Sequence, residues 1–463
     1  MDTNQKVAKR ISIIRNGEPF ANAFGARFIE DYVEELTIME SINSMTVEME
    51  LVINDFGGMF NYLTGTELFK VEISTTNSDK TYFMRANGVE SRVVDGKGAE
   101  QYIIRCYSEE YLRNEGKNIF GHTAVLFNDN TEASNIVKTL MKDQRYLNST
   151  KRIYAEESLN FHSAVIPSWR PFDLIAFLCQ RSYRKNKPLT ADKFQGGFQF
   201  FESGLGYHFT SIDKMIEDVR NTKVGTNTDP NTGRTAMYEY SLVPKGMSGG
   251  IAQGGGDDYF ALEGFSVVEE GNLFRRMRDG LFSGYSIGFD PVSIKSSQVG
   301  LSSDLPTSAF QYHVADMWNN MEHLDTKRGG NPTVVVDNGI KSFVDTPRRV
   351  RYNVIPNNIF DTRSNVNTLN YSQISLLDTY DYVRRSTLKN MIAKAKMSGN
   401  LDLYAGKGVK IKIPQSQQAD NTKGIRDNDP QYSGKYLIAA VTHTVKGDEM
   451  TTLLELRRDS IPN

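Results

Sequence analysis

The clearest pattern along the chain is an alternation of apolar and mostly polar residues close to the N-terminus. Val47, Met49, Leu51 and Ile53 occupy every second position of residues 47–54. This period of two is typical of a strand with one buried face. Shorter candidate strands follow at residues 67–75, 81–88 and 100–108, separated by turn-forming Asn, Asp, Ser and Gly. Several short strands with turns between them predict that residues 1–125 form a compact β unit, a barrel or a sandwich.

A helical period appears in the next part of the chain. Residues 131–145 carry an apolar stripe, with Asn130 or Thr131 as the expected N-cap. A second helix is expected over about 168–184, capped by Ser168 and with Cys179 on its inward stripe. Two strands, 197–202 and 207–210, and a short helix from Ser211 complete the pattern. Residues 126–215 are therefore predicted to form a mixed α/β unit.

The remaining half alternates between irregular and β-rich segments. Residues 216–264 are rich in Gly, Asn and Thr and predict an irregular excursion, interrupted by a strand over 235–243. A small unit with strands at 265–268 and 285–295 follows. Residues 301–384 predict a loop-rich insertion with a helix at its end, which we expect over 375–397. The last strands are expected at 399–404, 409–414, 435–445 and 450–457, with a hairpin turn at 446–449.

Composition narrows the classes of function. The 463 residues suggest two to four domains. Lys and Arg number 54 and Asp and Glu 56, a net charge of −2, which argues against wrapping a duplex but not against lining a conduit for DNA. Two cysteines make no disulfide framework and suit a reducing cytosol. The N-terminus is polar and no apolar run approaches the roughly 20 residues of a membrane span, so we expect no signal peptide and no membrane embedding.

One segment matches a catalytic pattern. Residues 284–288 (GYSIG) fit the G-x-S-x-G pattern of an α/β-hydrolase, with Ser286 as the nucleophile. That chemistry needs a strand, a strained turn and then a helix, but Phe289, Asp290 and Pro291 follow directly. The parallel strand–helix rhythm of the hydrolase fold is also missing. A strand with glycines is the favoured interpretation, and a serine hydrolase using Ser286 remains the weaker alternative.

The other chemical patterns have simpler explanations. Ser211 begins an S-x-x-K match without its companion motifs and is interpreted as a helix cap. The glycine-rich loop over 246–256 lacks the Gly-Lys-Ser/Thr ending of a phosphate loop.

Cys179 is expected in the core, and His443 at a solvent-facing or cross-strand position. The adjacent glutamates at 109–110, 156–157 and 269–270 suit helix starts or polar faces. The six histidines show no metal-ligand spacing. We predict no catalytic residue, no cofactor and no metal site.

The order of the elements resembles a known family. After the N-terminal β unit and a helix come IPSWRPFD at 166–173, FQFF at 198–201 and GYHFTSIDKM at 206–215. The closing unit contains GVKIKI at 408–413 and YLIAAVTHTV at 436–445. This arrangement resembles the baseplate central hub proteins of T4-like contractile-tailed bacteriophages, which are related to the hub part of type VI secretion spike proteins. Residues 220–260 and 300–370 have no counterpart in the resemblance.

The resemblance implies an α+β, β-rich fold with two tail-tube-like β-barrels. The first barrel would comprise residues 1–125, and the second, discontinuous one residues 265–300 and 385–463. The mixed domain 126–215, the excursion 216–264 and the insertion 301–384 would lie between or beside them.

It also implies a function without catalysis. Three copies would form a structural adaptor in the virion, at the tail baseplate, joining the six-fold tail tube to a three-fold spike during genome ejection. The implied partners are the chain itself, the tail tube or tube-initiator protein, the central spike protein and baseplate wedge proteins, with the tape-measure protein as a further candidate. DNA would pass only through the lumen. The chain ends soon after its last hairpin, so we expect the spike to be a separate polypeptide. Another phage tail-tip or type VI-like spike component is the alternative.

Overall fold

The computed structural model describes most of the chain. The described residues are 5–20, 28–58, 63–75, 78–94, 100–121, 126–127, 131–158, 165–185, 195–225, 236–242, 260–270, 272–289, 311–324, 337–347, 349–354, 371–415 and 428–460. The predicted glycine-rich loop over 246–256 lies outside them, as do His122 and His162.

Six strands from the second half of the chain close into a barrel. In spatial order they run β22, β19, β15, β14, β20 and β21, and β21 pairs again with β22. The interior is apolar and fully packed. On β19 it is lined by Met391, Ala393, Ala395 and Met397, all at 0% exposure. The bounds of the strands are β14 Tyr238–Leu242, β15 Ala261–Glu270, β19 Met391–Ser398, β20 Gly408–Lys412, β21 Gly434–Lys446 and β22 Glu449–Arg458.

The N-terminal strands form a second six-stranded unit around a core of its own. Its order is β4, β5, β8, β7, β6 and β2, and every second residue of these strands points inward. The last strand returns to the first: Ile29 N donates to Ile11 O at 2.9 Å, and Lys9 Nζ donates to Val33 O at 2.9 Å. The unit is thus a barrel closed on one side by a connecting segment. The bounds are β2 Ala8–Arg15, β4 Val33–Ser41, β5 Glu48–Asp55, β6 Leu68–Ser74, β7 Asp79–Val94 and β8 Glu100–Ser108.

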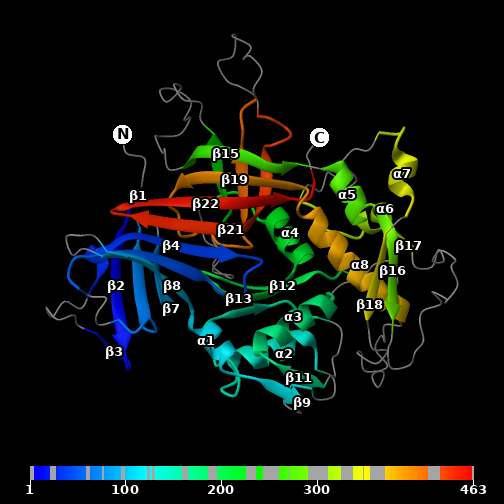
Figure 1. Cartoon of the computed structure of the whole chain (residues 1–463). Coiled ribbons are helices and arrows are strands. Elements are labelled where there is room, and N and C mark those ends of the chain that lie inside the picture. Colours follow the sequence, from blue (N-terminus) through cyan, green and yellow to red (C-terminus); the bar gives the residue numbers. More distant parts are fainter. Residues whose placement is uncertain are drawn as a thin grey trace, which may run out of the picture.

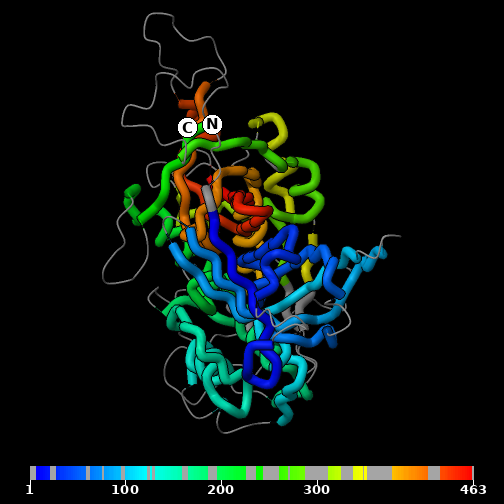
Figure 2. The backbone as a smooth tube through the Cα atoms, turned by 90° about the vertical axis from the view of Figure 1, so that its left-hand side faces the viewer, coloured from blue at the N-terminus to red at the C-terminus, as the bar shows by residue number. Residues whose placement is uncertain are grey.

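The two units share one continuous sheet. β21 of the closed barrel pairs antiparallel with β4 of the N-terminal unit over seven residue pairs, from Ala440–Ser41 to Lys446–Glu35. The red strand β21 therefore lies directly beside the blue strand β4, with β22 on the other side of β21 (Figure 1), and the view turned by 90° shows the red and blue segments next to each other (Figure 2). Short strands β1 (Gln5–Lys6) and β3 (Glu18–Pro19) end the sheet, whose order covers 14 strands.

A mixed α/β unit packs against this pair. Its core holds apolar side chains of α2 and α3 and of the β12–β13 hairpin, among them Leu140, Ile175 and Phe209. The element bounds are α1 Glu109–Glu115, β9 Ile119–Gly121, α2 Ala133–Lys142, β10 Ile153–Ala155, β11 Ile166–Trp169, α3 Pro171–Arg181, β12 Phe198–Ser203, β13 Gly206–Ser211 and α4 Ile212–Asn221.

A small three-stranded sheet with short helices lies at the far side from the N-terminal strands (Figure 1). The long helix α8 runs between it and the rest of the molecule. The bounds are α5 Leu273–Asp279, β16 Ser283–Phe289, β17 Gln311–His313, α6 Val314–Trp318, α7 Lys341–Asp345, β18 Val350–Val354 and α8 Tyr371–Thr387; the 3-10 turn η1 covers Glu30–Tyr32.

Several local predictions were wrong. The helix expected over 375–397 ends at Thr387, and Met391–Ser398 is the barrel strand β19. The alternation of buried residues with Lys394 and Lys396 is a period of two, which suits a strand rather than a helix. Residues 399–404 form turns instead of a strand.

The expected helix caps were also misplaced. The N-cap of α2 is Glu132 rather than Asn130 or Thr131, and the N-cap of α3 is Arg170 rather than Ser168. Pro171 is the first residue of α3, where its missing N–H costs nothing.

The strands of the closed barrel come from more of the chain than the expected second barrel. β14 lies within 216–264, which we predicted to be an excursion, and joins the barrel between β15 and β20. β16, within 265–300, pairs instead with β17 and β18. The five-part domain division itself stays a proposal, because strand pairing does not by itself fix domain limits.

Candidate assembly site

The barrels have filled interiors. The core of the N-terminal unit includes Ile11, Leu51 and Phe69, and that of the closed barrel includes Val409 and Leu456, all fully buried. Close-packed apolar side chains of this kind occupy the interior of a barrel in place of a water-filled lumen. What the pair of barrels can offer to other molecules is therefore its outer surfaces, its strand edges and its attached units.

A buried ion cluster fixes the mixed unit to the N-terminal barrel. Glu202, at the end of β12, accepts from Val47 N at 2.9 Å, from Ser108 Oγ at 2.5 Å and from Lys151 Nζ at 2.6 Å. Lys151 also binds Glu110 at 2.7 Å. Burial alone would raise the pKa of Glu110, but its pairing with Lys151 holds that pKa below the ordinary value. One lysine thus compensates two buried carboxylates, Glu110 of α1 and Glu202 of β12.

Next to this cluster, the β12–β13 turn covers one end of the N-terminal barrel. A side chain at Gly204 would meet both the Lys80 ammonium of β7 and the Glu40 carboxylate of β4. Glu40 is 1% exposed and also accepts from Ala405 N at 3.3 Å, in the loop that precedes β20. Burial raises the pKa of Glu40 to about 7, although Lys80 opposes the shift. Three parts of the chain therefore meet at Glu40.

A second buried network fixes α8 to α4 and to the end of β22. The Arg384 guanidinium lies 3.0 Å from Asp213 Oδ1 and 3.2 Å from Asp459 Oδ2, with all three side chains at 0% exposure. His323 Nδ1 lies 2.9 Å from Asp459, and Tyr380 OH donates to Asp213 at 2.7 Å. Burial would raise the pKa of Asp459, but His323 and Arg384 hold it well below its ordinary value. The network therefore connects α8, which packs against β16 of the peripheral sheet, to the end of the closed barrel.

The structure places Ser286 inside a strand. Ser286 is 2% exposed, on β16, opposite Arg351 of the parallel strand β18. The strand interpretation of this segment is therefore confirmed. The residues that follow Phe289 lie outside the described part, so the turn and helix of a hydrolase site are not tested there.

The other singled-out residues have structural roles. Ser211 caps α4, since its Oγ accepts from Lys214 N at 3.1 Å, as predicted. Cys179 is buried at 6% exposure on α3, and burial raises the pKa of its thiol to about 12. His443 is buried and bonds Thr452 Oγ1 across the β21–β22 pair at 3.0 Å, so the cross-strand alternative is the right one. Burial lowers the pKa of His443 to about 3.

Sequence reasoning missed the buried ion networks. Arg384, Asp213, Asp459, Lys151 and Glu202 lie far apart along the chain and belong to no motif. The nearest local signal was the Ser211 cap, which places Asp213 in the first turn of its helix. Within the described residues, no group of three or more His, Cys, Asp and Glu side chains is placed to hold a metal ion. None of the described helices is long and apolar enough to cross a membrane.

Comparison with solved structures identifies the fold. A 43 kDa tail protein of prophage MuSo2 from Shewanella oneidensis aligns over 98% of this chain and 99% of its own length, with a TM-score of 0.50 and 11% sequence identity. The fold is that of a phage tail protein. This confirms the predicted β-rich, barrel-containing fold class and, at the level of fold, the resemblance found in the sequence.

Two further structures are similar at lower scores. A tail protein from Neisseria meningitidis aligns over 98% of both chains, with a TM-score of 0.49 and 9% identity. An E. coli component of the type VI secretion system, described as similar to the T4 bacteriophage tail proteins gp27 and gp5, aligns over 97% of this chain and 77% of its own, with a TM-score of 0.40 and 10% identity. No protein-family profile and no curated protein matches the sequence.

Proposed function

We propose that this tail-fold protein is the central hub of a contractile phage baseplate, and that three copies form a ring between the six-fold tail tube and a three-fold spike. The observation that supports the proposal is the β4–β21 pairing, which places two barrels edge to edge in one chain. Three such chains would present six barrels to a six-fold tube while keeping three-fold symmetry on the opposite side.

The filled barrels support a channel at the ring centre rather than through each chain. Since the cores occupy both barrel interiors, DNA in transit would have to pass between chains. A chain with a net charge of −2 also has little non-specific attraction for phosphate, which suits passage better than binding. Heterologous contacts between identical copies close into such a ring when the rotation between them closes.

The proposed location is the baseplate of the virion, and the proposed partners are the tube or tube-initiator protein, the spike and the wedge proteins, with the tape-measure protein as a further candidate. We propose no catalytic role, because symmetry matching needs only surfaces. Purified Ser286→Ala protein should therefore behave as the unchanged chain in esterase and muramidase assays. An activity of the unchanged chain that disappears in this variant would instead support the hydrolase alternative.

The oligomeric state tests the hub. We expect native mass spectrometry of the full chain, over a range of concentrations, to detect a three-chain particle, and electron cryo-microscopy of assembled tails to place three copies around the axis. A single copy within an intact tail would contradict the hub. A six-copy ring would point to a tube component instead.

A further inference from the structure

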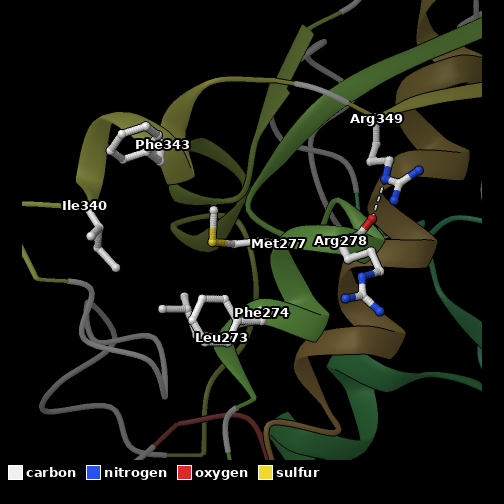
Figure 3. A pocket seen from close by; sticks show the side chains of 7 residues that line it. All are labelled: Leu273, Phe274, Met277, Arg278, Ile340, Phe343 and Arg349. Atoms are coloured by element: carbon white, nitrogen blue, oxygen red, sulfur yellow. Dashed lines mark hydrogen bonds between the residues drawn. The ribbon is translucent and has the colours of Figure 1, made fainter.

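An apolar groove lies between α5 and α7, on the peripheral unit away from the N-terminal barrel. Its volume is about 520 Å³, and Leu273, Phe274 and Met277 line it from α5. Ile340 and Phe343 line it from the α7 segment, so the side chains of the two short helices face one open space (Figure 3).

Two phenylalanines of this groove are unusually exposed. Phe274 is 78% exposed and Phe343 is 57% exposed. Exposed aromatic side chains that gather on one surface, rather than being scattered singly, mark interaction sites on soluble proteins. Phenylalanine is among the residue types enriched at the cores of protein–protein interfaces.

An ordinary surface helix directs its apolar face toward the protein core. Helix α5 instead exposes the apolar side chain of Phe274 to solvent. Here Arg276 is the buried side chain, and its Nη2 donates to Asn390 O at 3.1 Å. The helix ends are fixed as well: the Asn272 side chain accepts from Arg275 N at 3.0 Å, and Gly280 ends the helix at a φ of 73°. The buried arginine and the two caps hold Phe274 outward.

Helix α7 is also anchored. Val344 is buried, and its carbonyl accepts from Ser283 Oγ of β16 at 2.8 Å. With Val344 directed toward the core, the neighbouring Phe343 lies in the groove. Because both walls are held in place, a ligand would bind here without a large cost of ordering the protein.

The rim of the groove is cationic. Arg278 and Arg349 line it, and among the described residues that line the groove none is acidic. Arg349 Nε donates to the carbonyl of Arg278, which fixes one guanidinium beside the other residue's backbone (Figure 3). In the part of the chain that the structure describes, neither arginine has a carboxylate ion-pair partner. An arginine guanidinium at an interface donates strong, charge-assisted hydrogen bonds to a partner's carboxylate.

We propose that this groove binds a short amphipathic segment of another polypeptide, one that carries large apolar side chains next to Asp or Glu. The apolar side chains would pack between Phe274 and Phe343, and a flanking carboxylate would bind Arg278 or Arg349. A segment of this kind matches both the apolar floor and the cationic rim, whereas a nucleic acid matches only the rim.

The test uses the purified full chain and a fluorescein-labelled 15-residue probe peptide. The probe has Leu and Phe at positions i, i+3, i+4 and i+7 of a helix and Glu between them, and a matched probe has Lys in place of Glu. By fluorescence anisotropy we expect saturable binding of the Glu probe and at least about tenfold weaker binding of the Lys probe.

Three variants locate the binding. The double change Phe274→Ser and Phe343→Ser should weaken binding of the Glu probe at least about tenfold, because it removes the apolar contacts. Arg278→Glu should weaken binding of the Glu probe and strengthen binding of the Lys probe. The control is Phe120→Ser, which alters a phenylalanine that is equally exposed (77%) but lies on β9. All these side chains are exposed, so thermal unfolding should be unchanged, which a melting curve checks.

Failure to bind either probe, equal binding of both, or unchanged binding by the double variant would overturn the proposal. If the double variant instead lowers the oligomeric state of the chain, the groove is occupied by a second copy, and the proposal is also overturned. The proposed three-chain ring is tested separately, by the mass of the particle that the unchanged chain forms. A failure of the groove proposal therefore does not contradict the ring, and a failure of the ring does not contradict the groove.

Discussion

At the scale of single residues, buried charges connect parts of the chain that are distant in sequence. Arg384 joins α4 to the end of β22 through Asp213 and Asp459, and Lys151 joins carboxylates of α1 and β12. Removing one partner of a buried pair leaves an uncompensated charge, which costs far more than the loss of a surface ion pair.

Replacing Arg384 by methionine is expected to lower the free energy of unfolding by about 3–5 kcal/mol, since Asp213 and Asp459 would remain buried without their cation. Chemical denaturation measures the change. The control is Arg145→Met, because Arg145 is 58% exposed and pairs with Asp143 at the surface. The control should cost no more than about 1 kcal/mol. Equal effects of the two changes would contradict the structural role of the network.

The acid side chain of Glu40 predicts a dependence of stability on pH. Its pKa is raised to about 7 in the folded protein, whereas an unfolded glutamate titrates near 4.3. The folded state therefore holds a proton that the unfolded state releases, so the contribution of Glu40 to stability falls as pH rises from about 4 to about 7 and stays low above that.

Glu40→Gln should remove this loss. We expect the variant to be more stable than the unchanged chain at pH 8, by up to about 3 kcal/mol, and little different at pH 4.5. Unfolding curves at the two pH values give the comparison. A variant that is less stable at pH 8 would mean that the ionised carboxylate is held favourably by Lys80.

At the scale of elements, the β12–β13 hairpin is the piece that fixes the mixed unit to the N-terminal barrel. Its turn needs Gly206, which has a φ of 132° and no room for a side chain, because the Arg152 carbonyl lies against it. Tyr207 N donates to that same carbonyl at 2.9 Å, so the carbonyl cannot easily move away.

Gly206→Ala is expected to destabilise the protein by at least about 2 kcal/mol, from backbone strain together with the clash. The matched change Gly264→Ala, in strand β15, meets no atom within 4 Å and should be neutral or slightly stabilising. Thermal melts of the two variants decide the matter. Similar melting temperatures would show that the hairpin can relax at no cost.

At the scale of the whole molecule, the shared sheet predicts cooperative unfolding. β21 pairs with β20 and β22 in the closed barrel and with β4 of the N-terminal barrel. Unfolding of the closed barrel would therefore remove the strand that pairs with β4 at the edge of the N-terminal barrel. We expect differential scanning calorimetry to give one transition for both barrels, with equal calorimetric and van't Hoff enthalpies. Repeating the scan at a second rate controls for irreversible unfolding. Two separate transitions would mean that the barrels fold independently.

The sequence by itself determined much of the local β structure. Val47, Met49, Leu51 and Ile53 alternate because one face of β5 is buried, and that period is visible without any tertiary information. The Ser211 cap and the burial of Cys179 were likewise predictable, since both depend on neighbours within a few residues. The order of such elements was enough to indicate a tail-protein fold.

Only the tertiary structure decided what depends on distant residues. The helix expected over 375–397 was too long because Met391 and Ala395 fit a helical stripe as well as a strand face, and only pairing with β15 and β22 selects the strand. The position of β14 in the closed barrel, the β4–β21 pairing and the Arg384 network all join segments that lie far apart in the sequence. Such contacts follow from the free energy of the complete packing, and no local pattern of apolar and polar residues encodes them.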